Sequence, residues 1–396
     1  MTSLSILIPT KNRHEYLRDV LSSILSWDSQ DFEIVVQDNS DDNATYLAIE
    51  EYLSDHRLKY FYESEWLSVV DNFELAITNS SGQIITAIGD DDGVLPCILL
   101  LSTLMIDENI DALLPMKADY TWPDLISKYN STFNNSKLRY SKSISEVLRR
   151  RDAMKELNKV LSLGATIIGG LPRIYYGLVQ RKCLDEVKIR TGCYLPGPSP
   201  DMANAVSLGL VVQSFFSVEW PVFIAGSSVK STAGMGLKRT HIGNIEEISH
   251  LPKDTSSKWD SLIPKFWSGP TIWAQSASSS INEFHCKDDF CLNYTYLYAR
   301  CFVFFPERFQ ELVQLIRTSN YEGFSWFKFV CYYVSIWKLR FDSLIPKIKT
   351  KFGYSKMQDV YMSEDVMNIS QAVNLMNDFL PKPIFILDNG CEISEG

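Results

Sequence analysis

Three consecutive aspartates, Asp90, Asp91 and Asp92, form a cluster that could bind a metal ion. Adjacent carboxylates repel one another, so the cluster is costly unless a cation or solvent relieves the repulsion. Carboxylate oxygens suit Mg²⁺ or Mn²⁺, which commonly bridge a carboxylate and the phosphates of a substrate. A solvated acidic turn is the alternative. The apolar run over residues 84–88, directly before the cluster, favours the metal site.

Two further polar clusters follow short apolar runs. The stretch from Thr10 to Arg13 comes after the run 4–8, and Asp38 comes after the run 32–36. If these runs are parallel strands, their carboxyl ends lie on one edge of a sheet, where ligands bind in open α/β folds. We therefore expect the polar clusters and the three aspartates to converge on one rim.

The elements that would position these clusters alternate between strand and helix over residues 1–116. Between the apolar runs, hydrophobic residues recur at helical spacing, and Asn12 is expected to cap the first helix, with Glu15 three residues on. Strands are predicted at 4–8, 32–36, 58–62, 84–88 and 112–116. Such alternation predicts an α/β fold, a Rossmann-like, mostly parallel sheet flanked by helices.

The rest of the chain changes character. After residue 116 we expect a charged helix over 145–160, strands at 175–180 and 220–225, and a segment rich in Gly, Ser and Thr over 226–243. From about residue 255 the pattern is mainly helical. The predicted division is a domain over 1–250, with halves 1–116 and 117–250, the second carrying a helical insertion, followed by a helical C-terminal region over 251–396.

The composition limits the classes of function. The 396 residues are 45% hydrophobic and 22% charged, which is typical of a globular protein. A net charge of −10 argues against nucleic acid as a partner. The eight cysteines are scattered without zinc-ligand spacing, which favours a reduced, cytoplasmic protein. The N-terminus lacks a signal-peptide pattern, and no apolar run is long enough to span a bilayer.

The residues around the aspartates resemble a known family. The opening stretch Ile6 to Arg13, the second strand with its turn at 34–40, and residues 82–96, with the aspartates and a trailing proline, are similar to family 2 glycosyltransferases of the GT-A fold. The resemblance is specific over residues 4–116, extends to about 245, and does not cover the C-terminal third. One position departs from the family pattern, because the usual leading aspartate of the motif falls on Gly89.

The resemblance implies a nucleotide diphosphate sugar as donor, with UDP- or dTDP-sugars preferred, and Mn²⁺ or Mg²⁺ as cofactor. Asp38 would accept a hydrogen bond from the base, Asp90 would lie near the ribose, and Asp91 and Asp92 would bind the metal. The other residues that the resemblance assigns to the nucleotide are Pro9, Thr10, Asn12, Arg13 and Asn72.

Asp201 is the candidate catalytic residue. By resemblance, a carboxylate well after the metal motif deprotonates the acceptor hydroxyl, and the reaction inverts the anomeric carbon; such a base must lie within hydrogen-bond reach of that hydroxyl. The alternative is a helix-capping aspartate after Pro200. Lys230 and Arg239 could close over the diphosphate, and His241 could add a metal ligand. Ordinary solvated loop residues are the alternative for these three.

The function that follows is an inverting glycosyltransferase, acting on a saccharide or lipid-linked acceptor in surface polysaccharide synthesis. A nucleotidyltransferase is one alternative, although such enzymes usually have a Gly-rich loop after the first strand and residues 9–13 contain no glycine. A catalytically inactive binding module of the same fold is the other.

The segment 324–356 is rich in aromatic and basic residues. It is expected either to pack on the protein core or to lie in a membrane interface, a zone that Trp, Tyr and basic residues favour. It could equally form the contact face of a homo-oligomer. Membrane contact would place the protein at the inner face of the cell membrane.

Overall fold

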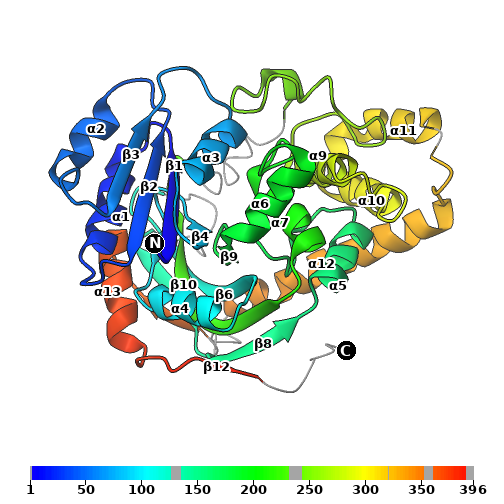
Figure 1. Cartoon of the computed structure of the whole chain (residues 1–396). Coiled ribbons are helices and arrows are strands. Elements are labelled where there is room, and N and C mark those ends of the chain that lie inside the picture. The colour runs from blue at the N-terminus through cyan, green and yellow to red at the C-terminus, as the bar shows by residue number, and fades with distance from the viewer. Residues whose placement is uncertain (1, 126–134, 232–242, 320, 352–359, 389–396) are drawn as a thin grey trace.

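A twelve-stranded sheet runs through the part of the chain that the computed structural model describes, namely residues 2–125, 135–231, 243–319, 321–351 and 360–388 (Figure 1). Its main path has the strand order β12-β8-β10-β6-β9-β4-β1-β2-β3. Helices cover both faces. The α/β class predicted from the sequence is confirmed.

The N-terminal half supplies the parallel part of this sheet, in the order β4-β1-β2-β3. The three inner strands of this part are buried along nearly their whole length because helices cover both of their faces, whereas the edge strand β3 is mostly half-buried. The elements are β1 (Leu4–Thr10), α1 (His14–Leu25), β2 (Phe32–Asp38), α2 (Ala44–Ile49), the 3₁₀ helix η1 (Glu50–Tyr52), β3 (Leu58–Tyr62), α3 (Val69–Thr78), β4 (Ile84–Ala87) and α4 (Ile98–Asp107).

The second half makes the sheet mixed, because β10 lies parallel to β6 but antiparallel to β5 and β8. The strands are β5 (Gly93–Val94), β6 (Ala112–Thr121), β7 (Lys137–Ser141), β8 (Val147–Arg151), β9 (Leu178–Gln180) and β10 (Phe215–Ser227). The helices are α5 (Ala153–Ser162), α6 (Arg181–Thr191) and α7 (Pro200–Val211).

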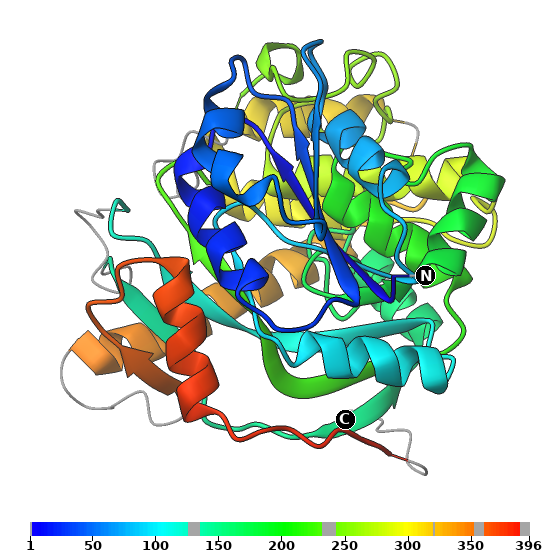
Figure 2. The same cartoon turned by 60° about the vertical axis from the view of Figure 1, so that its left-hand side comes forward.

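The C-terminal region is largely helical, as predicted. It comprises η3 (Ile245–Glu247), α9 (Gly269–Glu283), α10 (Tyr294–Phe304), η4 (Pro306–Arg308), α11 (Phe309–Thr318) and α12 (Trp326–Lys351). The chain then returns to the sheet (Figure 2). Strand β11 (Val360–Ser363) pairs with β7, helix α13 (Ile369–Phe379) packs on α1 and β5, and strand β12 (Ile386–Leu387) pairs with β8. The predicted boundary at residue 250 stays a prediction.

Three hydrophobic clusters hold these layers together. One lies between the sheet and α1, α4 and α13, and a second lies between the opposite face and α3, α6 and α7. The third joins α5 and α7 to α9, α10 and α12. Through this third cluster, the C-terminal helices support the half of the molecule that carries Asp201.

Two local predictions are wrong. The expected helix over 145–160 is strand β8 followed by α5, because Val147–Arg151 pairs with β10 and Asp152 caps the helix by accepting a hydrogen bond from the Lys155 amide. Asn12 does not cap α1. Its backbone has a φ of 56°, and its side-chain amide donates to Asp41 at 2.7 Å instead.

Candidate active site

The three aspartates follow β4 at the carboxyl edge of the parallel strands, as the sequence predicts. All three are buried, with exposed fractions of 2% for Asp90, 4% for Asp91 and 1% for Asp92. The polar residue that ends β1 meets them there, since the Thr10 hydroxyl donates to an Asp90 carboxylate oxygen at 2.6 Å. The convergence of strand ends on one rim is therefore present in the structure.

Asp92 is held by four donors. The hydroxyls of Tyr175 and Tyr176 donate to its carboxylate at 2.9 and 2.7 Å. The backbone amides of Gly89 and Gly226 donate at 2.6 and 2.7 Å. A carboxylate with this many partners anchors the loop to β10 and to the segment before β9, and its oxygens are already engaged.

Arg13 lies between the other two aspartates. Its Nε is 3.0 Å from an Asp90 oxygen, and its Nη2 is 2.7 Å from an Asp91 oxygen. The Ser228 hydroxyl also donates to Asp91, at 2.6 Å. A cation at the point where the carboxylates approach each other relieves their repulsion.

These contacts perturb the ionisation of the cluster. Burial, followed by the neighbouring aspartates, raises the pKa of both Asp90 and Asp92 above the ordinary range of a carboxyl, and Arg13 partly offsets this for Asp90. Burial disfavours the charged guanidinium of Arg13, but Asp90 and Asp91 outweigh it, so the pKa of Arg13 is raised. Strongly perturbed groups gathered at one strand edge are typical of functional sites.

Two glycines allow the chain to approach the aspartates closely. A Cβ on Gly226 would lie 1.8 Å from the Asp91 carbonyl oxygen, which no side chain can occupy. A Cβ on Gly89 would lie 2.9 Å from an Asp92 oxygen and 3.0 Å from the Tyr175 hydroxyl. The departure from the family pattern at Gly89 thus accompanies the tight cage of donors around Asp92.

The remaining residues predicted to bind the nucleotide lie beside this rim. Asp38, which ends β2, is fully buried and accepts from the Ser40 amide and hydroxyl at 2.8 and 2.6 Å and from the Tyr60 hydroxyl at 2.8 Å. Asn72 of α3 donates to the Thr10 and Gln37 carbonyls at 3.3 Å. Its own carbonyl oxygen is buried and lacks a partner among the described residues.

Asp201 lies in the first turn of α7 with Pro200 at the helix start. Burial raises its pKa, and the cation of Arg173 partly offsets the effect. The charge of Asp201 also acts on Tyr175, whose hydroxyl binds Asp92, so the candidate base and the aspartate cluster are electrostatic neighbours. The loop before α7 is braced from the C-terminal region, because the Ser276 hydroxyl of α9 accepts from the Ser199 amide at 2.9 Å.

Comparison with known proteins identifies the fold that carries this site. Residues 5–162 match the family described as Glycosyl transferase family 2. This match places residues 5–162 of the chain in that family. A curated relative, the GalNAc(5)-diNAcBac-PP-undecaprenol beta-1,3-glucosyltransferase of Campylobacter jejuni, is 34% identical over 111 residues. That match spans 28% of this chain and 35% of the relative's length.

Two solved structures resemble a larger part of the chain more distantly. S. aureus TarS 1–349 in complex with UDP-GlcNAc has a TM-score of 0.48 at 14% identity and covers 79% of each chain. The mannosyltransferase PcManGT from Pyrobaculum calidifontis, in complex with GDP-Man and Mn²⁺, has a TM-score of 0.40 at 13% identity, covering 95% of this chain and 87% of its own. Likenesses of this size do not bear on function.

The carboxylates at this rim suit a cation that a substrate helps to bind. Among the described residues, no group of three or more His, Cys, Asp or Glu side chains could hold a metal alone. The carboxylates of Asp90 and Asp91 meet at a cation, Arg13, whose Nε lies 3.0 Å from the buried Asp90 oxygen that does not bind Thr10. One or two carboxylates plus substrate phosphates is the usual arrangement for Mg²⁺.

The predicted loop residues are only partly described. The Lys230 ammonium donates to the Asn12 carbonyl at 3.3 Å and pairs with Glu15 at 2.5 Å, so the structure brings it to the β1 end. Arg239 and His241 lie outside the described residues. Pro9 lies within β1, one residue before Thr10.

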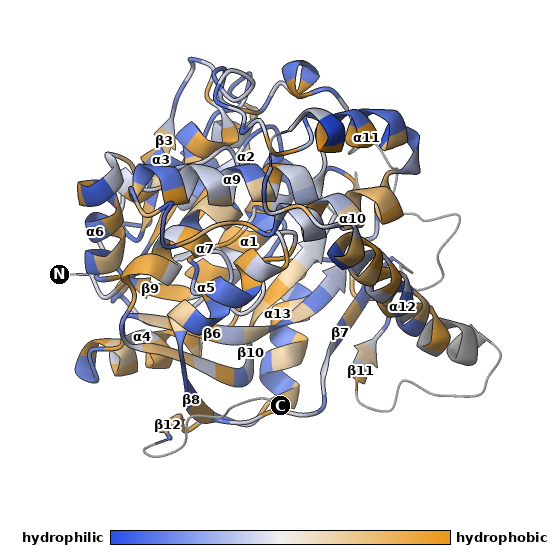
Figure 3. Ribbon diagram, turned by 90° about the vertical axis from the view of Figure 1, so that its right-hand side faces the viewer, coloured by the Kyte–Doolittle hydropathy of each residue, from blue (hydrophilic) through white to orange (hydrophobic). Residues whose placement is uncertain are grey.

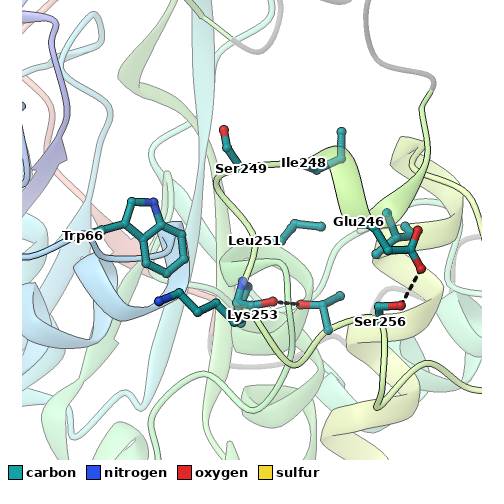
Figure 4. Close-up of a pocket in the computed structure, with 10 residues that line it drawn as sticks. Trp66, Glu246, Ile248, Ser249, Leu251, Lys253 and Ser256 are labelled. Atoms are coloured by element: carbon teal, nitrogen blue, oxygen red, sulfur yellow. Dashed lines mark hydrogen bonds between the residues drawn. The ribbon is translucent and has the colours of Figure 1, made fainter.

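A separate pocket of about 500 Å³ lies between Trp66 and the segment from Ile245 to Ser256 (Figure 4). Trp66 forms one side, with the Lys253 ammonium 5.0 Å from the centre of its ring. Opposite, the Ser256 hydroxyl donates to Glu246 at 2.6 Å. The pocket's lining does not include the aspartate cluster, but the Trp66 loop is tied to the end of β2, because the Leu67 amide donates to the Asn39 side chain at 3.0 Å.

Sequence reasoning missed the residues that hold the aspartates in place. The sequence predicts a strand over 175–180, but β9 begins only at Leu178, so Tyr175 and Tyr176 precede it, and Ser228 falls in the predicted segment rich in Gly, Ser and Thr. The available signal was an aromatic pair just before Gly177 and a polar stretch at the end of the longest strand. Neither signal indicates contact with Asp91 or Asp92, which lie more than eighty residues earlier.

Proposed function

We propose that this family 2 protein is a metal-dependent inverting glycosyltransferase, which transfers a sugar from a nucleotide diphosphate sugar to a saccharide or lipid-linked acceptor in surface polysaccharide synthesis. The observation that carries the proposal is the buried rim where Asp90 and Asp91 meet Arg13 at the end of β4. A cluster of this kind binds the charged part of a donor, and Asp201 nearby supplies a base.

The donor site extends from the end of β1 to the end of β4. Asn72 has a buried carbonyl oxygen without a partner in the described part of the chain, which supports a role as an acceptor for the nucleotide. The Asp38 carboxylate accepts a hydrogen bond from the Tyr60 hydroxyl, so it can bind the base of the nucleotide only if an N–H of that base replaces this hydroxyl. By resemblance, UDP- and dTDP-sugars fit best. Pro9, Thr10, Asn12, Arg13 and Lys230 complete the proposed nucleotide site.

Within the cluster we assign different roles to the aspartates. Asp90 lies nearest the β1 end through Thr10 and would face the ribose. Asp91 would hold Mn²⁺ or Mg²⁺, with His241 a further candidate ligand. The ion, when bound, would neutralise the charge that builds up on the departing diphosphate. Asp92 was predicted to bind the metal too, but its four donors favour a role in positioning Asp91.

Asp201 would act as the general base. Its carboxylate takes the proton from the acceptor hydroxyl as that oxygen bonds to the anomeric carbon and the bond to the diphosphate breaks. Attack from the face opposite the leaving group inverts the configuration. The raised pKa of the half-buried Asp201 carboxyl suits the role, because a base is most effective when its pKa approaches the working pH.

The acceptor is supported by the relative from Campylobacter jejuni, whose name describes a lipid-linked acceptor, a diphosphoundecaprenol saccharide. Because the match covers only 35% of that protein, the acceptor class is a proposal for this chain. A nucleotidyltransferase is disfavoured, because residues 5–162 match a family of glycosyltransferases.

Thermal unfolding with a panel of nucleotides tests the donor site. UDP, dTDP and GDP, and sugars linked to them, are added with and without Mn²⁺ to the wild type, to Asp91→Ala and to a control, Asp28→Ala, which alters an exposed aspartate after α1. We expect one nucleotide to raise the unfolding temperature in a metal-dependent way, because a ligand that binds only the native state stabilises it. The effect should be lost in Asp91→Ala and kept in the control.

A second measurement separates an active enzyme from an inactive module. Release of the nucleoside diphosphate is followed with the nucleotide sugar identified in the panel, first with water and then with saccharide and lipid-linked acceptors. Donor binding without release in the presence of any acceptor would favour a module that kept the fold and lost the reaction. Absence of donor binding altogether would overturn the proposed function.

A further inference from the structure

Helix α12 buries one side and leaves apolar residues exposed on the other. Phe329 and Ile336, with exposed fractions of 7% and 2%, pack in the cluster shared with α10. Along the opposite side run large hydrophobic residues that the described part of the chain leaves exposed: Phe327 (79%), Val330 (55%), Val334 (60%), Phe341 (60%), Leu344 (42%) and Ile345 (46%). Figure 3 shows α12 along the outside of the molecule, with hydrophobic positions spread along it.

These six residues form one stripe. With 3.6 residues per turn, positions 327, 330, 334, 341, 344 and 345 all fall within about 100° of the circumference of the helix, on one side of it. We call this set the outer stripe of α12. Exposed apolar residues scattered singly are ordinary, but a continuous stripe along a long helix marks a surface that contacts something apolar.

The helix that carries the outer stripe is basic in sequence. It contains Lys328, Lys338, Arg340 and three lysines in its last turns, against one acidic residue, Asp342, and Lys338 is exposed beside the stripe. The whole chain carries a net charge of −10, so this helix is locally opposite in sign. Surfaces that combine apolar residues with Lys and Arg are typical of helices that lie in a membrane interface.

We propose that the outer stripe of α12 docks onto an anionic phospholipid surface. The helix would lie in the plane of the headgroups with the outer stripe facing the acyl chains and its basic residues among the phosphates. It does not cross the bilayer, because no helix among the described residues is long and apolar enough to do so. A second copy of the chain is disfavoured as the partner, since two like-charged helices would face each other.

Neighbouring residues extend the same surface. Trp326, at the start of α12, is 60% exposed, and Phe309 of α11 is 54% exposed. Both pack around the buried end of α12: the Trp326 ring lies 5.7 Å from Phe329, and Phe309 lies 5.2 Å from Phe302. Exposed aromatic rings at the edge of the stripe suit the headgroup region, which Trp favours. Docking here would hold the enzyme at the surface where a lipid-linked acceptor resides, and this link to catalysis rests on the proposed function.

Vesicle flotation tests the docking without donor or acceptor, so its outcome is independent of the sugar-transfer chemistry. Full-length protein is mixed with vesicles of phosphatidylcholine, alone or with about a third phosphatidylglycerol, at low and high salt. The double variant Val334→Ser/Phe341→Ser removes two residues of the stripe, each 60% exposed. The matched control is Leu339→Ser, which alters a residue 62% exposed on the side of the helix away from the outer stripe, where Lys328 also lies.

We expect the wild type and the control to float with the anionic vesicles and the double variant to bind at least about tenfold more weakly. Lys338→Gln, which removes the exposed cation beside the outer stripe, should weaken binding by about fivefold and reduce its salt dependence. Thermal unfolding of each variant checks that the exposed substitutions leave the fold intact. Equal flotation of the double variant and the control, or no binding by the wild type, would overturn the proposal. Light scattering gives a further outcome. If the double variant changes between monomer and dimer while the wild type does not bind vesicles, the outer stripe is a contact between copies of the chain and the proposal is overturned.

Discussion

Single residues decide whether the aspartate cluster can exist in a buried rim. Arg13 neutralises Asp90 and Asp91, and the donors around Asp92 fix the loop that carries them. Of these, only Arg13 could be anticipated from the sequence. The donors Gly226, in β10, and Ser228, just after it, lie more than 130 residues further along the chain, so the local sequence around the aspartates does not indicate them.

At Gly226 we expect substitution by alanine to lower the free energy of unfolding by about 3 kcal/mol or more, because the added Cβ would lie 1.8 Å from the Asp91 carbonyl. Urea unfolding of Gly226→Ala measures this. Gly269→Ala is the control, since a Cβ there meets nothing within 4 Å. Similar stability of the two variants would contradict the close approach of β10 to the aspartate loop.

For Asp201, the expected loss of turnover in Asp201→Asn is about 10²- to 10⁴-fold, the usual contribution of a general base. A residue that only interacts with the helix N-terminus would instead cost stability and leave turnover unchanged. The two roles are separated by measuring the rate of transfer and the urea midpoint on the same preparation.

The pH dependence of transfer gives a second test of Asp201. A base acts when ionised, so the rate falls as pH drops through its pKa. Because burial raises that pKa, the acidic limb should lie above the ordinary value of 3.8. Arg173 opposes the shift, so Arg173→Gln should move the limb to still higher pH, while Arg173→Lys should leave it near that of the wild type. If the pH of the acidic limb is the same in the wild type and in both variants, Asp201 is not the group whose ionisation produces it.

At the scale of elements, the predicted strands at 4–8, 32–36, 58–62 and 84–88 correspond to β1 to β4 because buried parallel strands are continuous apolar runs. The same logic failed at 145–160. Strand β8 carries three arginines, and only its pairing with β10 makes it a strand. Local pattern therefore predicts the elements that bury two faces, and misses those that long-range pairing defines.

Helix α13 gives an element-scale prediction. Met376 is fully buried in the cluster that α13 shares with α1 and the sheet, so Met376→Ala should lower the free energy of unfolding by about 2–5 kcal/mol. Phe379→Ala, at a position 63% exposed on the same helix, should change it by less than about 0.5 kcal/mol. Equal effects in chemical unfolding would mean that α13 does not pack on the N-terminal half in solution.

The whole molecule is expected to unfold as one unit. Leu157 of α5 and Met202 of α7 are fully buried in the cluster that they share with the C-terminal helices, so removing residues 251–396 would expose them. Calorimetry of the full chain should show a single transition whose calorimetric and van't Hoff enthalpies agree. Two separate transitions, or a stable fragment 1–250 with a cooperative unfolding of its own, would show that the predicted boundary is a true domain boundary.

The packing of α13 on α1, the first helix of the chain, has a consequence during synthesis of the chain. The strands that bear the donor rim are complete by about residue 90, yet the helix that covers α1 and β5 ends at Phe379. At the usual pace of about 5–20 residues per second, roughly a quarter of a minute to a minute of translation separates the two. During that time the apolar surface that α13 later covers on α1 and β5 is exposed in the nascent chain. A chaperone at the ribosome would bind this surface.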